Sequence, residues 1–341
     1  ASWTRTMGGS GDGSFTIPTA RLDRAEVQRI ARGWATTMVV EYLSGSPVAG
    51  TPEYAGLVQS VDWDGLTLTV HTKELPIIMT KRQLFGVQPG PVTRTYQGAA
   101  LADVIVQLIR TVYLGGSTRW NLPLSTGPWN PYSNAVVRTF DWWRFLPAVD
   151  ALKSLTDEAG APLWDMRPYW NVGTLGWRLY VGDLEGGVVD LPVSTPAHPV
   201  KSGAQVSVTR DWQAQLTGVI TIGTGQEDAI RWGRSGSMDM TVADAIPWLD
   251  ATESWIQVED VNRLNVLARG KLAEQRYGVD QWTVAVQCDD ELTPTMLRPG
   301  TEARLIHPGD KLVSPGTYRQ RVLSVAGDLS MKRTLTVQEV R

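Results

Sequence analysis

The sequence predicts a mainly β protein with an α+β insertion, in which two strand-rich units flank a unit of mixed helix and strand. Near both ends of the chain, short runs alternate polar residues with bulky or β-branched ones, which is the period of a strand. Glycine, proline and aspartate separate these runs at short intervals, as turn residues do. A length of 341 residues exceeds one ordinary core and favours two or three domains. We therefore predict domains at residues 1–94, 95–203 and 204–341.

The first unit opens with SWTRTMGGSGDGSFTIPTAR, a glycine-rich stretch with two explanations. A phosphate-binding P-loop needs a lysine after the glycines and then a helix. Here no lysine follows, and both flanks alternate like strands. The stretch is therefore predicted to be a flexible turn between two antiparallel strands. A short helix at 19–34 and strands at 37–43, 53–61 and 65–72 follow, which is typical of a small barrel or sandwich.

The middle unit begins after the glycines and prolines of residues 86–91. Its first helix is predicted from apolar residues at helical spacing, Leu101, Ile105, Leu108 and Val112. A loop rich in proline, glycine and asparagine covers 115–134, and a second helix is expected at 146–159. Two facing strands at 162–170 and 176–181 complete this unit.

The last unit is strand-rich again and contains one long helix. The helix is predicted at 258–276, with its apolar stripe at Val261, Leu264, Leu267, Ala268 and Leu272. Glu259 and Asp260 precede it, where carboxylates cap backbone donors or interact with the helix dipole. The predicted strands cover 206–211, 215–222, 237–242, 281–288, 302–306, 317–328 and 330–338.

Composition and motifs exclude several classes of protein. The formal net charge of −3 provides no general attraction to nucleic acid or anionic membranes, and no apolar run is long enough to span a membrane. Cys288 is the sole cysteine, so we expect folding in a reducing cytoplasm and an ordinary strand cysteine rather than a nucleophile. The three histidines are far apart in the sequence, and no serine-hydrolase elbow is present. We predict no catalytic residue, no metal and no cofactor.

Tryptophan is unusually frequent, with 15 residues against 4 phenylalanines. One group lies in and beside the long loop of the middle unit: Trp120, Trp129, Tyr132, Trp142 and Trp143. Exposed aromatic residues on a long loop are typical of contacts with protein or carbohydrate. Local packing is the alternative explanation, because most large aromatic side chains are simply buried.

Three stretches near the N-terminus resemble the start of minor tail proteins from siphophages of actinobacteria: SWTRTMGGSGDGSFTIPT, GWATTMVVEY and YAGLVQSVDWDGLTLTVHTKELPIIMTKRQL. The residues that match the pattern of this family are Trp3, Ile17, Pro18, Gly56, Val58, Arg82 and Leu84. The resemblance continues in LKSLTDEAGAPLWDMRPYW, in the helix DVNRLNVLARGKLAEQ and in the closing PGTYRQRVLSVAGDLSMKRTLTVQEV. It covers almost the whole chain but rests on order and pattern.

The resemblance implies a baseplate hub at the tail tip of the virion, with two tail-tube-like antiparallel β-barrels flanking the mixed domain. Such hubs are homotrimers whose ring surrounds the DNA channel without binding DNA specifically. The ring joins the hexameric tail tube or distal tail protein to the threefold tip, beside other tail-tip proteins and the tape measure protein. The turn with Gly9, Gly11, Asp12 and Gly13 is then a candidate inter-subunit or lumen loop. The alternatives are a hexameric distal tail protein, a wall carbohydrate-binding tail-tip protein and, more remotely, a cytoplasmic enzyme.

Overall fold

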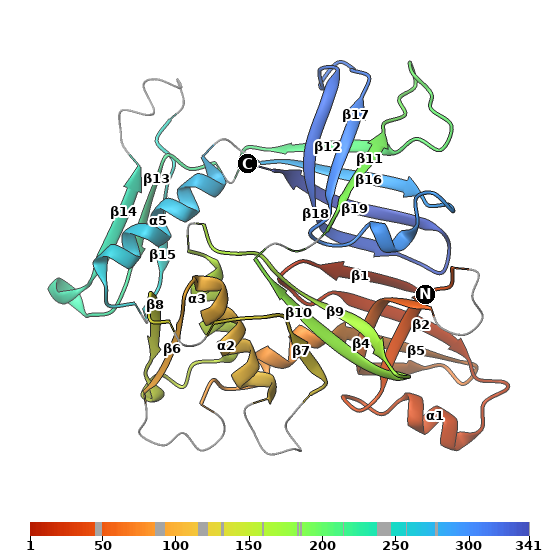
Figure 1. Cartoon of the computed structure of the whole chain (residues 1–341), viewed down its shortest axis with the longest axis horizontal. Coiled ribbons are helices and arrows are strands. Elements are labelled where there is room, and N and C mark those ends of the chain that lie inside the picture. Colours follow the sequence, from red (N-terminus) through yellow and green to blue (C-terminus); the bar gives the residue numbers. More distant parts are fainter. Residues whose placement is uncertain are drawn as a thin grey trace.

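The computed structural model has the mainly β character with added helices that the sequence predicts (Figure 1). It describes residues 1–44, 50–85, 93–114, 122–130, 133–158, 160–182, 184, 186–213, 215–236, 247–256, 258–276 and 279–340. One large sheet occupies one side of the molecule, and three small sheets with the longer helices lie beside it.

The large sheet has eleven strands that come from both ends of the chain. Its main path runs β12-β16-β19-β18-β1-β2-β5-β4-β3, and β17 branches from β18 to pair with β11. The N-terminal strands are β1 (Ser2–Thr6), β2 (Asp12–Pro18), β3 (Thr37–Tyr42), β4 (Thr51–Trp63) and β5 (Thr67–Glu74). The others are β11 (Val188–Pro192), β12 (Gln205–Asp211), β16 (Val279–Gln287), β17 (Glu302–His307), β18 (Gly316–Gly327) and β19 (Lys332–Glu339).

Strand β1 joins the two ends of the chain. It pairs antiparallel with β2 on one side and with β18 on the other, where Trp3 faces Gly327. Within the described residues no strand pair connects β3 to β12, so this sheet is open there. The two separate closed barrels that we predicted are not observed among the described residues. Instead, β1 joins the two strand-rich units into one continuous sheet.

The small sheets belong to the middle of the chain. One contains β7 (Leu124–Thr126), β10 (Thr174–Val181) and β9 (Trp164–Asn171), and a second contains β6 (Arg94–Gly98) and β8 (Val136–Phe140). The third contains β14 (Trp232–Gly236), β13 (Gly218–Ile222) and β15 (Asp250–Ser254). The helices are α1 (Arg24–Ile30), α2 (Leu101–Leu114), α3 (Ala148–Thr156) and α5 (Val261–Gln275), with 3-10 turns η1 (Leu75–Thr80), η2 (Trp142–Arg144), η3 (Glu227–Ala229) and η4 (Pro294–Met296). None of the helices in the described part is long and apolar enough to cross a membrane.

Strand β4 separates two hydrophobic cores. Tyr54 and Val58 belong to the core of the large sheet, whereas Ala55 and Leu57 point the other way into the core of the middle unit. Successive strand residues point to opposite faces, so a strand that is covered on both sides is buried at every position. This explains why β4 is buried continuously from residue 52 to residue 58.

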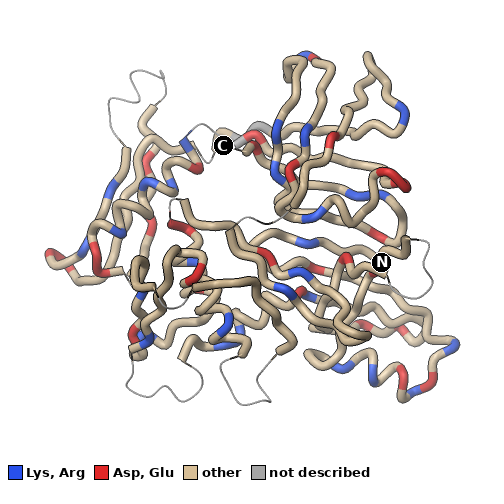
Figure 2. Tube along the Cα trace, in the orientation of Figure 1, with Lys and Arg blue, Asp and Glu red and all other residues tan. Residues whose placement is uncertain are grey.

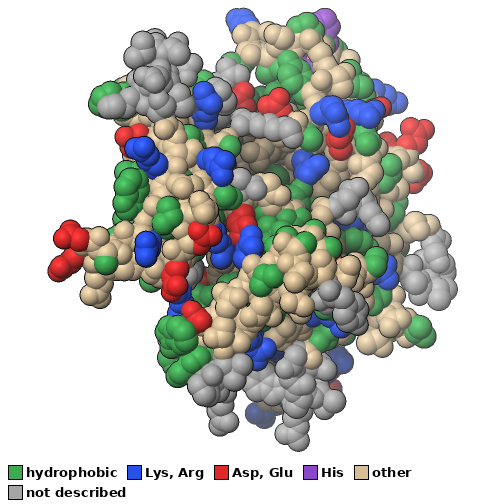
Figure 3. Space-filling model, turned by 60° about the vertical axis from the view of Figure 1, so that its left-hand side comes forward, with side chains coloured by type: hydrophobic (Ala, Val, Ile, Leu, Met, Phe, Trp, Pro, Cys, Tyr) green, Lys and Arg blue, Asp and Glu red, His purple; other side chains and the backbone are tan. Residues whose placement is uncertain are grey.

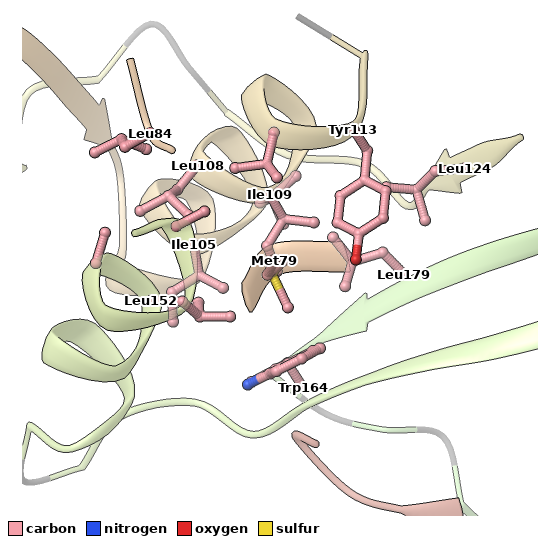
Figure 4. Close-up of a cluster of buried hydrophobic side chains, with 14 of the residues drawn as sticks. Met79, Leu84, Ile105, Leu108, Ile109, Tyr113, Leu124, Leu152, Trp164 and Leu179 are labelled. Carbon is pink, nitrogen blue, oxygen red and sulfur yellow. The ribbon is translucent and has the colours of Figure 1, made fainter. Parts of the chain in front are cut away.

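The middle core is built by α2 and α3 against the β9–β10 hairpin (Figure 4). Ile105, Leu108 and Ile109 of α2 point toward Leu152 of α3 and toward Leu179 of β10. The Tyr113 hydroxyl donates to the Leu75 carbonyl oxygen at 3.0 Å. That bond satisfies a buried polar group and fixes α2 to the segment that follows β5.

A separate α/β unit lies between β12 and β16, which are themselves paired antiparallel. Helix α5 packs on the β14-β13-β15 sheet through Leu264, Leu267, Ala268 and Leu272, as the predicted stripe requires, whereas Val261 is exposed. Figure 1 shows this unit at the left end, away from the large sheet. The domain boundaries at 94/95 and 203/204 stay a prediction, and the predicted strand at 237–242 lies outside the described residues.

Candidate functional site

A cleft of about 850 Å³ lies where the α5 unit meets the middle unit. One wall follows η2 and the start of α3, and the other follows the ends of β13 and β15. Acidic and basic side chains gather along this junction in the space-filling view (Figure 3). The residues that line the cleft include Trp143, Arg144, Pro147, Asp150, Lys153, Thr224, Gln226, Glu253, Trp255, Ile256 and Glu259.

Large apolar side chains form the rim of this cleft. Trp143 is 55% exposed and Ile256 is 71% exposed, one on each wall. Trp142 packs against the middle core and meets the rings of Trp143 and Phe145 edge to face, each at 6.3 Å. Phe145 has a left-handed backbone (φ 45°) and is 60% exposed. Since such a conformation is unfavourable for an aromatic residue, the surrounding packing holds η2 in place and presents Trp143 to solvent.

Charged side chains connect the two walls of the cleft. Arg144 donates to the Glu259 carboxylate at 2.9 Å, and Lys153 lies 4.9 Å from the centroid of the Trp255 ring. Trp255 is buried, but the Lys153 side chain is largely exposed and also pairs with Asp157 at 2.6 Å, so this cation–π contact has the modest strength of an exposed one.

A second connection, around Arg263 of α5, is more buried. The Arg263 guanidinium donates to the Ser154 carbonyl oxygen at 3.0 Å and lies 3.2 Å from the Glu158 carboxylate, which also binds Arg138 at 2.6 Å. Burial lowers the pKa of Arg263. The position of α5 relative to α3 is thus held by directional bonds. The contact between Arg263 and Ser154 joins residues 109 positions apart, and no sequence motif marks it.

Of the five predicted aromatic residues, the structure brings together Trp142 and Trp143. Trp129 lies apart from them, half-buried against the middle core, with the Arg110 guanidinium 5.3 Å from its ring centroid. Trp120 and Tyr132 lie outside the described residues. Of the three described members, Trp129 and Trp142 pack against the middle core and Trp143 faces solvent.

The glycine-rich turn connects β1 to β2 as predicted, and its backbone lies close against neighbouring strands. A Cβ at Gly11 would lie 1.8 Å from the Thr4 carbonyl oxygen, and one at Gly13 would lie 2.6 Å from Thr72 Oγ1. The Gly11 N–H donates to the Glu74 carboxylate at 3.0 Å. Gly11 and Gly13 are buried, and Gly13 lies within β2 rather than in the turn, so at these two positions glycine permits a close approach of backbone to neighbouring strands.

The other two residues of the glycine-rich stretch, Gly9 in the turn and Asp12 at the start of β2, are more accessible. Asp12 is exposed and pairs with Lys73 at 2.6 Å, and Gly9 is half-buried. An exposed ion pair of this kind contributes little to stability. A role of the turn at a subunit interface or in a lumen stays a prediction.

Glu74 belongs to a buried network that ties three parts of the chain together. The Arg5 guanidinium donates to Glu74 at 2.9 Å and to Asp165 at 3.3 Å, and Arg167 donates to Asp165 at 3.0 Å. Burial raises the pKa of Glu74 to about 7, although the Arg5 charge acts in the opposite direction. Because separating buried charges is costly, this network fixes β1 and β5 against the β9–β10 hairpin.

Cys288, His71 and His307 lie in surroundings that do not favour catalysis. Cys288 is buried, and burial raises the pKa of its thiol to about 11, which disfavours the reactive thiolate. His71 contacts Asp62 at 2.9 Å, whereas His307 accepts from the Gly309 N–H at 3.0 Å. In the described part of the chain, no group of three or more histidine, cysteine, aspartate or glutamate side chains is placed to hold a metal ion.

No family model and no curated protein matches the sequence, but solved structures do. The tail protein from Neisseria meningitidis MC58 matches with a TM-score of 0.56 and 13% identity, over 99% of this chain and 90% of that chain. The 43 kDa tail protein of prophage MuSo2 from Shewanella oneidensis matches with a TM-score of 0.53 and 8% identity, over 99% and 93%. At these identities the likeness shows a shared fold over nearly the whole chain.

Proposed function

We propose that this chain is a structural protein of a phage tail. The observation that carries the proposal is the fold shared with two solved tail proteins over 99% of the chain. The resemblance of the sequence to siphophage minor tail proteins independently favours the same class. The surroundings of Cys288 and of the histidines are consistent with a role that needs no chemistry.

Within this class we propose a baseplate hub that forms a homotrimeric ring around the DNA channel at the tail tip. The strand-rich units at the two ends of the chain would supply the two tail-tube-like barrel segments, so that three copies give a pseudo-sixfold ring. Strands β3 and β12 end the described path of the large sheet, and unpaired edges of this kind are suited to strand pairing between subunits. The partners of such a hub would be the distal tail protein or tail tube ring, other tail-tip proteins and the tape measure protein.

The number of copies in an assembled tail tests the hub proposal. A cryo-electron microscopy map of the tail tip, with the chain fitted, should contain three copies around the tail axis. Six copies would favour a distal tail protein instead. A chain that stays a monodisperse monomer, and that is absent from assembled tails, would contradict both.

The exposure of Trp143 favours a second candidate, the binding of host cell-wall carbohydrate. A sugar ring stacks on an accessible aromatic face, and the cleft beside Trp143 is wide enough for a saccharide. Purified host walls should then retain the chain, and Trp143→Ala should abolish retention. Trp129→Ala is the matched control because Trp129 lies apart from the cleft. Equal retention of both variants, or no retention of the unmodified chain, would remove this candidate.

A further inference from the structure

The β9–β10 hairpin has two chemically different faces. Trp164, Met166, Trp177 and Leu179 face the middle core. The opposite face carries Arg167, Tyr169, Arg178 and Tyr180, with Arg167 directly across from Arg178 and Tyr169 across from Gly176. Two like charges at directly opposed positions of antiparallel strands are unfavourable. Asp165 lies on the same face, across from Tyr180, and binds Arg167 at 3.0 Å, which offsets part of this repulsion; Arg178 has no such carboxylate partner among the described residues.

The aromatic rings of this face hold the two guanidinium groups. Arg167 lies 4.5 Å from the ring centroid of Tyr180, and Arg178 lies 4.9 Å from that of Tyr169. Both contacts are diagonal, so each arginine stacks on a tyrosine of the other strand. Stacking restricts the planar guanidinium while leaving its N–H edge available for a ligand.

This face forms one wall of a cleft of about 350 Å³. Arg5 of β1 and Arg298, which follows η4, complete its basic lining, and the start of β4 at Thr51 and Pro52 forms another side. Three distant parts of the chain thus place four guanidinium groups around one cavity.

Two of the four arginines have carboxylate partners and two do not. Arg5 and Arg167 are buried and bind Glu74 and Asp165. Arg178 is exposed and Arg298 is half-buried, and neither makes an ion pair within the part of the chain that the structure describes. Burial, and then the charges of Arg167 and Arg5, lower the pKa of Arg298.

Other acidic groups near the cleft are already engaged. Glu41 accepts from the indole N–H of Trp170 at 2.8 Å, and Glu53 is paired with Arg333 at 2.6 Å. An anion that entered the cleft would therefore meet guanidinium groups with free donors, and it would relieve the repulsion between Arg298 and its neighbours.

We propose that this arginine–tyrosine cleft is a binding site for a carboxylate, presented as an acidic side chain by another polypeptide chain. Guanidinium groups bind carboxylates through two parallel hydrogen bonds, and the planar fork held by Tyr169 is prepared for that geometry. The cleft has room for one acidic side chain and its neighbours. Nucleic acid fits less well, because basic and acidic residues are interspersed over the part of the chain that the structure describes and form no continuous basic track there (Figure 2). The proposal does not depend on the tail hub function.

The test uses the full chain and a defined probe, the peptide acetyl-Gly-Asp-Glu-Asp-Glu-Gly-amide. Isothermal titration calorimetry at low ionic strength should detect binding of this peptide. It should detect no binding of the control peptide of the same length in which Asn and Gln replace Asp and Glu. Arg178→Gln combined with Arg298→Gln should weaken binding by about tenfold or more, because both unpaired forks are lost. Arg21→Gln removes an exposed charge elsewhere and should leave the affinity unchanged.

Three results would overturn the proposal. The first is that the unmodified chain does not bind the acidic peptide. The second is that the double variant binds the peptide as tightly as the unmodified chain does. The third is tighter binding of inorganic phosphate or of a thymidine decanucleotide, which would assign the cleft to phosphate. If the double variant does not fold by circular dichroism, Arg178→Gln alone decides the outcome, since this side chain is exposed and is the more accessible of the two unpaired forks.

Discussion

The indole ring of Trp3 lies directly against the Cα of Gly327, its partner across strands β1 and β18. A Cβ on Gly327 would approach Trp3 Cζ2 to 2.8 Å. The Arg333 guanidinium lies on the same ring, 5.3 Å from its centroid, and binds Glu53 of β4. The first and last strands of the chain are therefore joined by a close-packed and charged contact.

Gly327→Ala should lower the free energy of unfolding by about 1–3 kcal/mol, because the added methyl group overpacks the Trp3 contact. Urea unfolding followed by circular dichroism measures this change. Gly316→Ala is the matched control in the same strand, since the nearest atom to its Cβ would be 3.9 Å away. Equal stability of the two variants would show that Trp3 does not need the bare glycine.

Gly11→Ala should disrupt the opening hairpin. Its methyl group would overlap the Thr4 carbonyl oxygen, which belongs to the backbone of β1 and cannot move without the strand. We expect a loss of about 4 kcal/mol or more, or insoluble protein. Gly9→Ala, whose nearest contact would be an ordinary 3.5 Å, should change stability by less than about 0.5 kcal/mol. A soluble and equally stable Gly11→Ala would mean that the turn is flexible after all.

The buried pair of Glu53 and Arg333 should show strong coupling in a double-mutant cycle. Both side chains are about 5% exposed, and their shortest N–O distance is 2.6 Å. Glu53→Met or Arg333→Met alone leaves one buried charge unpaired, which typically costs about 3–5 kcal/mol. The double variant should lose much less than the sum of the two. Additive losses, measured by urea unfolding, would contradict this expectation.

Glu74 should make stability depend on pH. Burial raises its pKa from 4.5 to about 7, so between these values the folded protein binds a proton that the unfolded chain has released. The free energy of unfolding must therefore decrease as pH rises through this window. We expect a decrease of about 1 kcal/mol or more between about pH 5 and about pH 8, and a smaller one in Glu74→Gln. Identical slopes for the two proteins would exclude Glu74 as the source.

Local pattern was sufficient for the longest elements. Apolar residues spaced by four, three and four positions in 101–112 predict α2, and the apolar stripe in 258–276 predicts α5. A helix that buries one face must repeat its apolar residues at about this period. The hairpin predicted at 162–170 and 176–181 is confirmed as β9 and β10. The short strands β6, β8, β11, β14 and β15 were not predicted. Five residues carry little periodicity, and the five-residue strands β1 and β13 were predicted because their alternation stands beside clear turn signals.

The candidate sites were less predictable from the sequence. The sequence singled out Trp142 and Trp143 as aromatic residues near a loop, but exposure separates them, and exposure depends on the core beneath η2. The arginines of the second cleft carried no signal, because Arg5, Arg178 and Arg298 come from three distant segments. Charged residues on strands usually face water, so nothing local distinguishes a clustered arginine from an isolated one.

The sequence by itself determined the mainly β class, the two principal helices and the hairpin at the N-terminus, because these follow from local period and turn chemistry. Tertiary structure alone decided that β1 pairs with β18, so that the two strand-rich ends share one sheet. It also decided that Gly11 lies against Glu74 and that four arginines surround one cleft. The physical reason is that these contacts join residues far apart in the chain, where pairing is set by burial and charge in the folded state rather than by neighbours in sequence.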